Sequence, residues 1–296
     1  MAAQPQTFPD NENVVIRRAT PDDAEVCGRI CFEAFSTIAG EHNFPPDFPT
    51  PEVSTQVLST MFSHPGFFCV VAEQDGKLIG SNCLDERTAI AGVGPITIDP
   101  NAQNRAVGRQ LMQAAIDRAR GKRFAGIRLV QAAFHNRSLS LYAKLGFVVR
   151  EPLACMQGRP ILKTHPEYKV RSAGQSDLAA CNELCLRVHG HDRGGELKDA
   201  IEQHTAVVAE AGGQIVAYAS SIAFSGHAAA RTNEGLQALL AAATEFQGPG
   251  ILVPTRNSSL FRWCLENCLK VVQPMTLMTM GLYNEPAGAY LASILF

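Results

Sequence analysis

The sequence predicts an α/β (α+β) fold made of two tandem domains, each with a mixed central β-sheet flanked by helices. Three observations support this prediction: strand-like and helix-like segments occur in both halves, the two halves share short motifs in the same order, and the length suffices for two cores. At 296 residues the chain exceeds the usual ~100 to 200 residues of one domain. Hydrophobic residues make up 46% of it, which is typical of a globular protein.

The start of each predicted domain has the same local pattern. Residues 14–23 read as a short strand followed by a polar turn, and residues 168–177 repeat this reading. An amphipathic helix follows each turn. Within these helices Cys27 matches Cys181 and Cys31 matches Cys185 at one offset of 154 residues. The pattern predicts an internal duplication.

Two further similarities between the halves follow in the same order along the chain. Residues 70–79 and 207–216 each read as a β-hairpin, because Asp75-Gly76 and Gly212-Gly213 favour the positive φ angles of tight turns. Residues 135–142 align loosely with residues 256–263, each opening a short helix after an apolar strand (residues 127–133 and 251–255). We therefore predict domains at residues 1–158 and 168–296, joined by a linker at residues 159–167.

Composition excludes several classes of protein. The net charge of −2 leaves no excess of positive charge for nucleic acid or for an anionic membrane surface. The first thirteen residues lack the pattern of a signal peptide, and no apolar run approaches the ~20 residues of a membrane span. The nine cysteines lack zinc-ligand spacing and are expected to pack as small apolar side chains. We expect a cytoplasmic protein without a metal.

The segment most informative about chemistry is residues 92–120. An apolar strand ends at Ile98-Asp99-Pro100, and a helix with Val107, Leu111 and Ile116 on one face follows. Between them lies a loop, Gln103-Asn104-Arg105-Ala106-Val107-Gly108, with small residues at 106 and 108. Backbone amides and the helix dipole converge at such a loop, and small residues let a pyrophosphate approach closely. The loop matches neither the P-loop pattern nor the dinucleotide fingerprint.

In this context the loop resembles the central motif of the GNAT superfamily of acyl-CoA-dependent N-acetyltransferases. That motif is a strand ending V-x-P, then Q/R-x-x-G-x-G/A, then a helix, and this chain departs from it with Ala106 in place of a glycine. The next motif of the family also follows here, as the strand at residues 127–133, then Asn136, Tyr142 and Leu145-Gly146-Phe147. The resemblance covers about residues 14–150.

The resemblance implies acetyl-CoA as co-substrate and a role for each matching residue. Backbone groups of Ile96, Thr97 and Ile98 would pair with pantetheine as an added strand, and Asn136 and Ser138 would contact pantetheine as well. Tyr142 would also lie at the cofactor sulfur, as general acid for the departing thiolate. The pyrophosphate would lie against the amides of Gln103, Asn104, Arg105, Ala106, Val107, Gly108 and Arg109. Two alternatives stay open: Tyr142 supplies aromatic bulk to its helix, and Asn136 caps that helix.

The acceptor is expected to be an amine of a small molecule or of a peptide. Asp85 and Glu86, after the second hairpin strand, are the candidates for the general base. Glu41, His42 and Phe44, in a predicted long loop at residues 36–50, are the candidates for acceptor binding.

The second half lacks a Q-x-x-G-x-G loop, and Trp263 stands at the tyrosine position. It is expected to be a degenerate copy that shapes the acceptor site or forms a homodimer face. Its methionine-rich tail reads as a core strand. The competing function is a non-catalytic module that binds acyl-CoA or another ligand.

Overall fold

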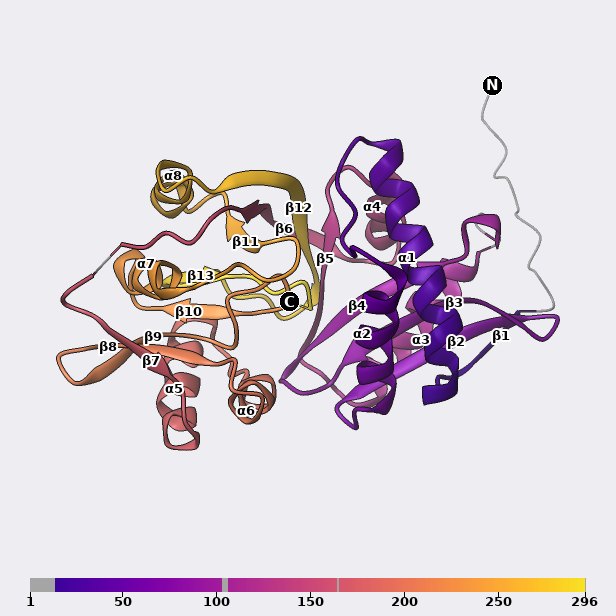
Figure 1. Cartoon of the computed structure of the whole chain (residues 1–296). Coiled ribbons are helices and arrows are strands. Elements are labelled where there is room, and N and C mark those ends of the chain that lie inside the picture. Colours follow the sequence, from indigo (N-terminus) through magenta and orange to yellow (C-terminus); the bar gives the residue numbers. More distant parts are fainter. Residues whose placement is uncertain (1–13, 103–105, 164, 296) are drawn as a thin grey trace, which may run out of the picture. The chain divides into compact units, whose positions relative to one another are not determined.

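The computed structural model describes residues 14–102, 106–163 and 165–295, and its chain path is drawn in Figure 1. The α/β class is confirmed, with mixed sheets flanked by helices. The chain forms two compact units. One, the N-terminal unit, comprises Met1–Leu84 and Val93–Arg123, and the other, the C-terminal unit, comprises Asp85–Gly92 and Phe124–Phe296. These units divide the chain at other points than the predicted domain boundaries.

The N-terminal unit is a sheet with helices on both faces. In chain order its elements are β1 (Val14–Arg18), α1 (Ala24–Glu41), α2 (Pro51–Ser63), β2 (Phe67–Gln74), β3 (Lys77–Asp85), β4 (Ile90–Ile98) and α3 (Val107–Gly121). The strands are hydrogen-bonded in the order β1-β2-β3-β4. Strand β1 runs antiparallel to β2, with Val14 opposite Gln74 and Arg18 opposite Val70.

Alternation along β2 explains why both faces of this sheet are covered. Val70 and Ala72 pack with Val107 and Leu111 of α3. Cys69 points to the opposite face, where its thiol donates to the carbonyl of Met61 in α2 at 3.7 Å. Figure 1 accordingly shows α1 and α2 on one face and α3 on the other. The period of two along a strand therefore sends alternate residues into two separate cores.

The C-terminal unit contains the rest of the elements. These are β5 (Gly126–Ala132), α4 (Asn136–Lys144), β6 (Val148–Gln157), β7 (Lys169–Ser172), α5 (Leu178–His189), α6 (Gly194–Glu202), β8 (Val207–Ala211), β9 (Gln214–Ala219), β10 (Ala228–Ala230), α7 (Asn233–Ala242), β11 (Ile251–Pro254), α8 (Ser258–Glu266), β12 (Lys270–Gly281) and β13 (Ala289–Leu291). The strands form two groups, ordered β5-β12-β6-β11 and β13-β10-β9-β8-β7. Residues 90–92 of β4 pair in parallel with residues 126–128 of β5.

Strand β12 joins the two predicted domains into one unit. It comes from the end of the second half, yet it lies between β5 and β6 of the first half and pairs antiparallel with both. Its residues Met275 and Leu277 share one core with Val130 of β5 and with Leu184 of α5. The methionine-rich tail is thus a core strand, as predicted. Because β12 completes the sheet of the other half, β5 and β6 belong to the C-terminal unit.

Local predictions are confirmed at both hairpins. Asp75 and Gly76 join β2 to β3 with φ of 50° and 76°, and Gly212 and Gly213 join β8 to β9 with φ of 57° and 75°. Eight of the nine cysteines are buried, as expected, whereas Cys268 is exposed, and all are free thiols. No described helix is both long and apolar enough to cross a membrane.

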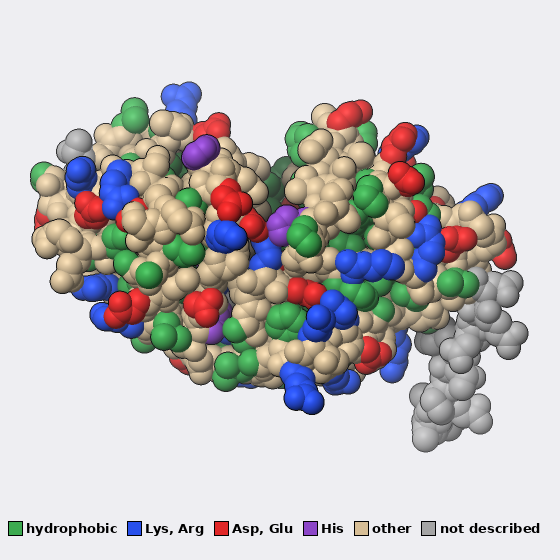
Figure 2. Space-filling model, turned by 90° about the horizontal axis from the view of Figure 1, so that it is seen from below, with side chains coloured by type: hydrophobic (Ala, Val, Ile, Leu, Met, Phe, Trp, Pro, Cys, Tyr) green, Lys and Arg blue, Asp and Glu red, His purple; other side chains and the backbone are tan. Residues whose placement is uncertain are grey.

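The surface agrees with the small net charge. On the face shown in Figure 2, acidic and basic side chains of the described residues are interspersed with apolar ones. This mixed surface matches the balance of 26 Lys plus Arg against 28 Asp plus Glu.

Candidate functional site

The strand that leads into the predicted cofactor loop is held on one side by β3. The amide of Asp99 donates to the carbonyl of Ile79 at 2.9 Å, directly after β4 ends. The Asp99 carboxylate then accepts from the amide of Asn101 at 2.8 Å and so fixes a short 3-10 turn, Pro100–Ala102. Of the three residues expected to pair with pantetheine, Thr97 is buried, and Ile96 and Ile98 are half-buried. Gln103, Asn104 and Arg105 lie outside the described residues.

Ala106 is the N-cap residue of α3 and adopts the left-handed backbone conformation, with φ of 60° and ψ of 3°. Its carbonyl accepts from the amides of Arg109 and Gln110 at 3.0 and 3.1 Å. The Ala106 side chain does not cap the helix, since a methyl group accepts no hydrogen bond. The amides of Val107 and Gly108 thus belong to the positive end of the helix dipole, which favours an anion.

The backbone conformation at position 108 does not itself require glycine. Gly108 is buried in the first turn of α3 and continues the helix from Val107. The positive φ expected in a glycine loop is carried by Ala106 instead. Arg109 is exposed beside this end of the helix.

The second motif of the resemblance forms α4, which begins four residues after β5. Asn136 is its first residue and is exposed, but the N-cap position is taken by His135. The alternative of Asn136 as the N-cap is therefore wrong. Tyr142 is buried at 6% exposure and packs edge-on against Phe147, with the ring centroids 6.3 Å apart.

Tyr142 keeps its proton at physiological pH. Burial raises the pKa of its phenol to about 12, and a hydrogen bond with the Ser138 side chain lowers it by less. A phenol with this pKa is protonated at neutral pH and can donate a hydrogen bond. The aromatic packing and the proton-donor role are compatible with each other.

Asp85 is held in an ion-pair bridge within the C-terminal unit. Its carboxylate accepts from Arg87 through Nε at 2.9 Å and Nη2 at 2.6 Å, while Nη1 of Arg87 donates to Asp199 of α6 at 2.9 Å. A carboxylate engaged in this way is a poor proton acceptor for an amine. Glu86, the other candidate base, is half-buried in the loop after β3.

The residues expected to bind the acceptor lie at the end of α1, because this helix extends further than predicted. It continues to Glu41, so the loop begins at His42 and not at residue 36. His42 caps the helix, and its Nδ1 lies 3.0 Å from the carbonyl oxygen of Ile38. Glu41 and His42 are exposed and Phe44 is half-buried.

Comparison with known proteins agrees with these motifs. The sequence model of the Acetyltransferase (GNAT) family matches residues 33–147, which include β4, α3 and α4. The match to this family thus covers the segment that contains both sequence motifs. No protein with a curated description matches it in sequence.

Solved structures extend the likeness to the whole chain. A protein of Pyrococcus horikoshii, named provisionally as an acetyltransferase, has a TM-score of 0.72 at 18% identity, with 98% of this chain and 97% of that chain covered. A GCN5-related N-acetyltransferase from Sphaerobacter thermophilus has a TM-score of 0.62 at 15% identity and covers 94% of this chain and 98% of its own. A tandem GNAT protein from the clavulanic acid pathway scores 0.56 at 13% identity, covering 90% and 98%. The fold is that of a tandem GNAT protein.

The second GNAT copy has only a short connection at the place that corresponds to the cofactor loop of the first. Only Arg231 and Thr232 separate β10 from α7, and the Thr232 hydroxyl caps this helix by accepting from the amide of Gly235 at 3.4 Å. Asn257, which aligns with Asn136, exchanges two hydrogen bonds with Asn233, at 3.1 and 2.8 Å. In the second copy, the start of α7 and the side chain of Asn257 are thus both engaged by the protein's own side chains. These are the two places that would contact an acyl-CoA.

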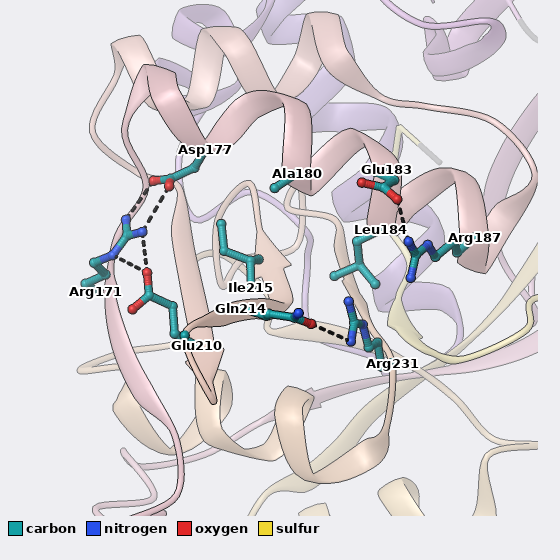
Figure 3. Close-up of a pocket in the computed structure, with 11 residues that line it drawn as sticks. Arg171, Asp177, Ala180, Glu183, Leu184, Arg187, Glu210, Gln214, Ile215 and Arg231 are labelled. Carbon is teal, nitrogen blue, oxygen red and sulfur yellow. Dashed lines mark hydrogen bonds and ion pairs between the residues drawn. The ribbon is translucent and has the colours of Figure 1, made fainter.

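A groove of about 590 Å³ lies on the second GNAT copy, between α5 and the β8–β9 hairpin (Figure 3). Arg171 at its edge bonds Asp177 at 2.6 Å and Glu210 at 2.5 Å. The first copy repeats this triad, since Arg17 bonds Asp23 at 2.8 Å and Glu73 at 3.0 Å. The triad is therefore a structural element of each GNAT copy, and it gives the groove no chemistry of its own.

The largest polar group that sequence reasoning missed is a buried histidine cluster in the C-terminal unit. His189 and His227 lie with their Nε2 atoms 3.3 Å apart, and the ring of His191 is 5.8 Å from that of His189. Burial lowers the pKa of all three, with the charges of Arg128 and Arg193 adding to the effect. Among the described residues no group has the geometry of a metal site. His189 and His191 lie two residues apart at the end of α5, but His227 comes from a distant segment, so no local signal could have found the cluster.

Proposed function

We propose that this protein transfers the acetyl group of acetyl-CoA to an amine of a small molecule or of a protein. The observation that carries this proposal is the start of α3, where the side chain of the N-cap residue Ala106 leaves the first helix amides without a cap of its own, inside the region that matches the GNAT family. The small size of Ala106 and Gly108 favours the close approach of a pyrophosphate to these amides. Backbone groups of residues 96–98 pair with pantetheine as an added strand.

In the proposed reaction the neutral amine attacks the thioester carbonyl directly, and the carbon–sulfur bond breaks as the tetrahedral intermediate collapses. Tyr142 gives its proton to the departing thiolate, and Asn136 and Ser138 hold the pantetheine arm. Glu86 is the candidate that takes the proton of the ammonium, and Asp85, the other candidate, is held by Arg87. Glu41, His42 and Phe44 are the candidates that contact the acceptor.

Binding of acetyl-CoA is tested with Gly108→Val in the full chain. A branched side chain in the first turn of α3 would fill the space next to the helix amides. We expect a folded variant, judged by its circular dichroism and melting temperature, in which acetyl-CoA no longer raises the melting temperature as it does for the wild type. Unchanged affinity for acetyl-CoA in a folded variant would remove the pyrophosphate assignment.

Catalysis is tested with Tyr142→Phe, which keeps the ring against Phe147 and removes only the proton donor. We expect turnover, measured as free thiol released in the presence of an amine from a panel, to fall by ~10²- to 10⁴-fold. The dissociation constant for acetyl-CoA should stay the same. Wild-type turnover in the variant would exclude the general-acid role. Tight binding of acetyl-CoA by the wild type without turnover on any amine would favour the non-catalytic binding module instead.

A further inference from the structure

The groove on the second GNAT copy has an apolar floor between two charged ends (Figure 3). Its volume of about 590 Å³ is within the range of sites that bind small organic ligands. Leu184 of α5, which is buried, and Ile215 of β9, which is half-buried, lie in the middle. The triad of Arg171 lies at one end, and Arg187 and Arg231 lie at the other. A ligand in this groove would therefore contact apolar surface next to arginine side chains.

The two ends differ in how their arginines are neutralised. Arg171 is bonded by both carboxylates of its triad. At the other end, Arg187 pairs with Glu183 on the exposed side of α5. Among the described residues, the hydrogen bond of the Arg231 side chain goes to the neutral amide oxygen of Gln214, at 3.3 Å, and no carboxylate pairs with it. This end of the groove thus has one positive charge more than it has carboxylates.

The first GNAT copy has an aspartate at the position of Arg231. The amide of Arg231 donates to the carbonyl of Val216 at 3.0 Å, and the amide of Asp99 donates to that of Ile79 at 2.9 Å. Val216 and Ile79 correspond, since each lies three residues after the second glycine or the only glycine of its hairpin turn. In the first copy the Asp99 carboxylate fixes the turn before the cofactor loop. The second copy lacks that loop, and the arginine at this position lines the groove instead.

The floor of the groove is apolar in both copies but differs in bulk. At the offset of 154 residues, Leu184 matches Ile30 and Ala180 matches Val26. Ala180 lines the groove from the exposed side of α5, and its methyl group is smaller than the valine side chain of the first copy. The smaller side chain leaves more room above the floor in the second copy.

We propose that this groove binds a small organic anion, with a carboxylate on Arg231 and a short apolar body on Leu184 and Ile215. The planar guanidinium of arginine can donate two parallel hydrogen bonds to a carboxylate. The apolar body of the ligand is removed from water by the floor, which favours binding. None of the residues assigned to acetyl transfer takes part, so this site is independent of the proposed function.

The test measures binding of hexanoate to the full-length protein by calorimetric titration at low ionic strength, where an exposed arginine is screened least. Hexan-1-ol keeps the carbon chain without the charge, hexylammonium reverses the charge, and inorganic phosphate supplies negative charge without a chain. We expect the dissociation constant for hexanoate to be at least ~10-fold below that of each other probe. Added salt should weaken the binding. General attraction of anions does not explain this result, because the protein has a net charge of −2.

Two variants separate the contribution of the charge from that of the floor. Arg231→Gln should raise the dissociation constant for hexanoate by ~10-fold or more, because the charge-assisted hydrogen bonds are lost. Ile215→Thr keeps a β-branched residue in β9 and should weaken the binding of hexanoate as well, through the loss of apolar surface. The matched control is Arg262→Gln, which removes an exposed arginine of α8 outside the groove and should leave the affinity unchanged. Unchanged melting temperatures show that the variants are folded.

Every other result overturns the proposed site. Wild-type affinity in a folded Arg231→Gln protein would place the hexanoate elsewhere, and an equal loss in Arg262→Gln would reduce the effect to overall charge. Binding of hexan-1-ol as tight as that of hexanoate would show that the charge takes no part. Binding of phosphate as tight as that of hexanoate, or wild-type affinity in Ile215→Thr, would show the same for the floor. Absence of hexanoate binding to the wild type at millimolar concentrations would exclude the site.

Discussion

At the scale of single residues, Ala106 is the position where local preference and the observed backbone conflict most clearly. A residue with a Cβ pays ~1 to 2 kcal/mol in the left-handed region, which glycine occupies freely. The GNAT motif has glycine at this position, whereas this chain places alanine in the left-handed conformation. The cost is located at the helix end that we assign to the pyrophosphate.

We predict that Ala106→Gly stabilises the protein and does not weaken binding of acetyl-CoA. Relief of the left-handed strain, less the extra flexibility of an unfolded glycine, gives a gain of about 0.5 to 1 kcal/mol in the free energy of unfolding. Loss of the exposed methyl group should lower the dissociation constant for acetyl-CoA or leave it unchanged. Urea denaturation and calorimetric titration measure the two quantities. A less stable variant would show that the methyl group makes contacts that outweigh the strain.

At the scale of elements, both GNAT copies contain the same triad of an arginine, an aspartate and a glutamate. The second copy has this triad although it lacks the cofactor loop. Asp23 accepts from the amide of Thr20 at 2.8 Å, and Asp177 accepts from that of Gly174 at the same distance. Each aspartate thus closes the turn between the first strand and the first helix of its copy, and it binds the arginine of that strand. The bonds persist in the second copy because they hold the fold together and do not depend on any ligand.

We predict that Asp23→Asn and Asp177→Asn each lower the free energy of unfolding by about 1 to 2 kcal/mol at pH 7. The Arg17 guanidinium lowers the pKa of Asp23 to about 2, and Arg171 lowers that of Asp177. A carboxyl group whose pKa is lower in the folded than in the unfolded protein stabilises the fold fully at a pH above the unfolded pKa of ~3.9. This contribution is lost as the pH falls toward the pKa of the folded protein. The difference between wild type and each variant should therefore shrink below about pH 4.

The control for this pair of variants is Glu25→Gln. Glu25 pairs with Arg29 at 2.5 Å, but both side chains are more than half exposed. Exposed pairs contribute ~0 to 1 kcal/mol, so this variant should unfold almost like the wild type. A loss at Glu25 equal to that at Asp23 would show that removal of surface charge, and not the triad, causes the effect.

At the scale of the whole molecule, the C-terminal unit contains more buried charge and potential charge than sequence patterns suggest. His189, His191 and His227 are all buried there, together with Arg128 and Arg193. Arg193 is paired with Glu196, whose other carboxylate oxygen accepts from the Ser220 hydroxyl at 2.8 Å. The interior of this unit is therefore polar as well as apolar, and its stability should depend on pH.

We predict that the melting temperature falls between about pH 6.5 and pH 4 because of these histidines. Burial lowers the pKa of His191 to about 4 and that of His189 and His227 well below the ordinary value. An unfolded histidine takes up a proton near pH 6.5, and the folded one does not, so acid favours the unfolded state. The slope of melting temperature against pH should be smaller in His191→Gln and unchanged in His204→Gln, which alters an exposed loop. A flat profile in the wild type would contradict the prediction.

Local features of this fold could be predicted from the sequence because each depends on a few adjacent residues. The turns at Asp75-Gly76 and Gly212-Gly213, the strand before Asp99, and the helices that carry Val107 and Tyr142 are of this kind. The predicted loop at residues 36–50 began too early, because the prolines near its end suggested a long loop. Residues 36–41 instead continue α1. Ala106 was recognised as a departure from the motif, but its backbone conformation was not.

The other features of the fold depend on contacts between segments that are distant in the chain. The placement of β12 between β5 and β6 depends on strands more than a hundred residues apart, and no periodicity in one segment specifies its partner. The bridge from Asp85 through Arg87 to Asp199 likewise joins two segments that are distant in the chain. The histidine cluster exists only because α5 and the segment before β10 pack together. In each case a buried charge or strand edge needs a pairing partner, since leaving it unpaired is costly in free energy. Only the tertiary structure brings that partner within reach.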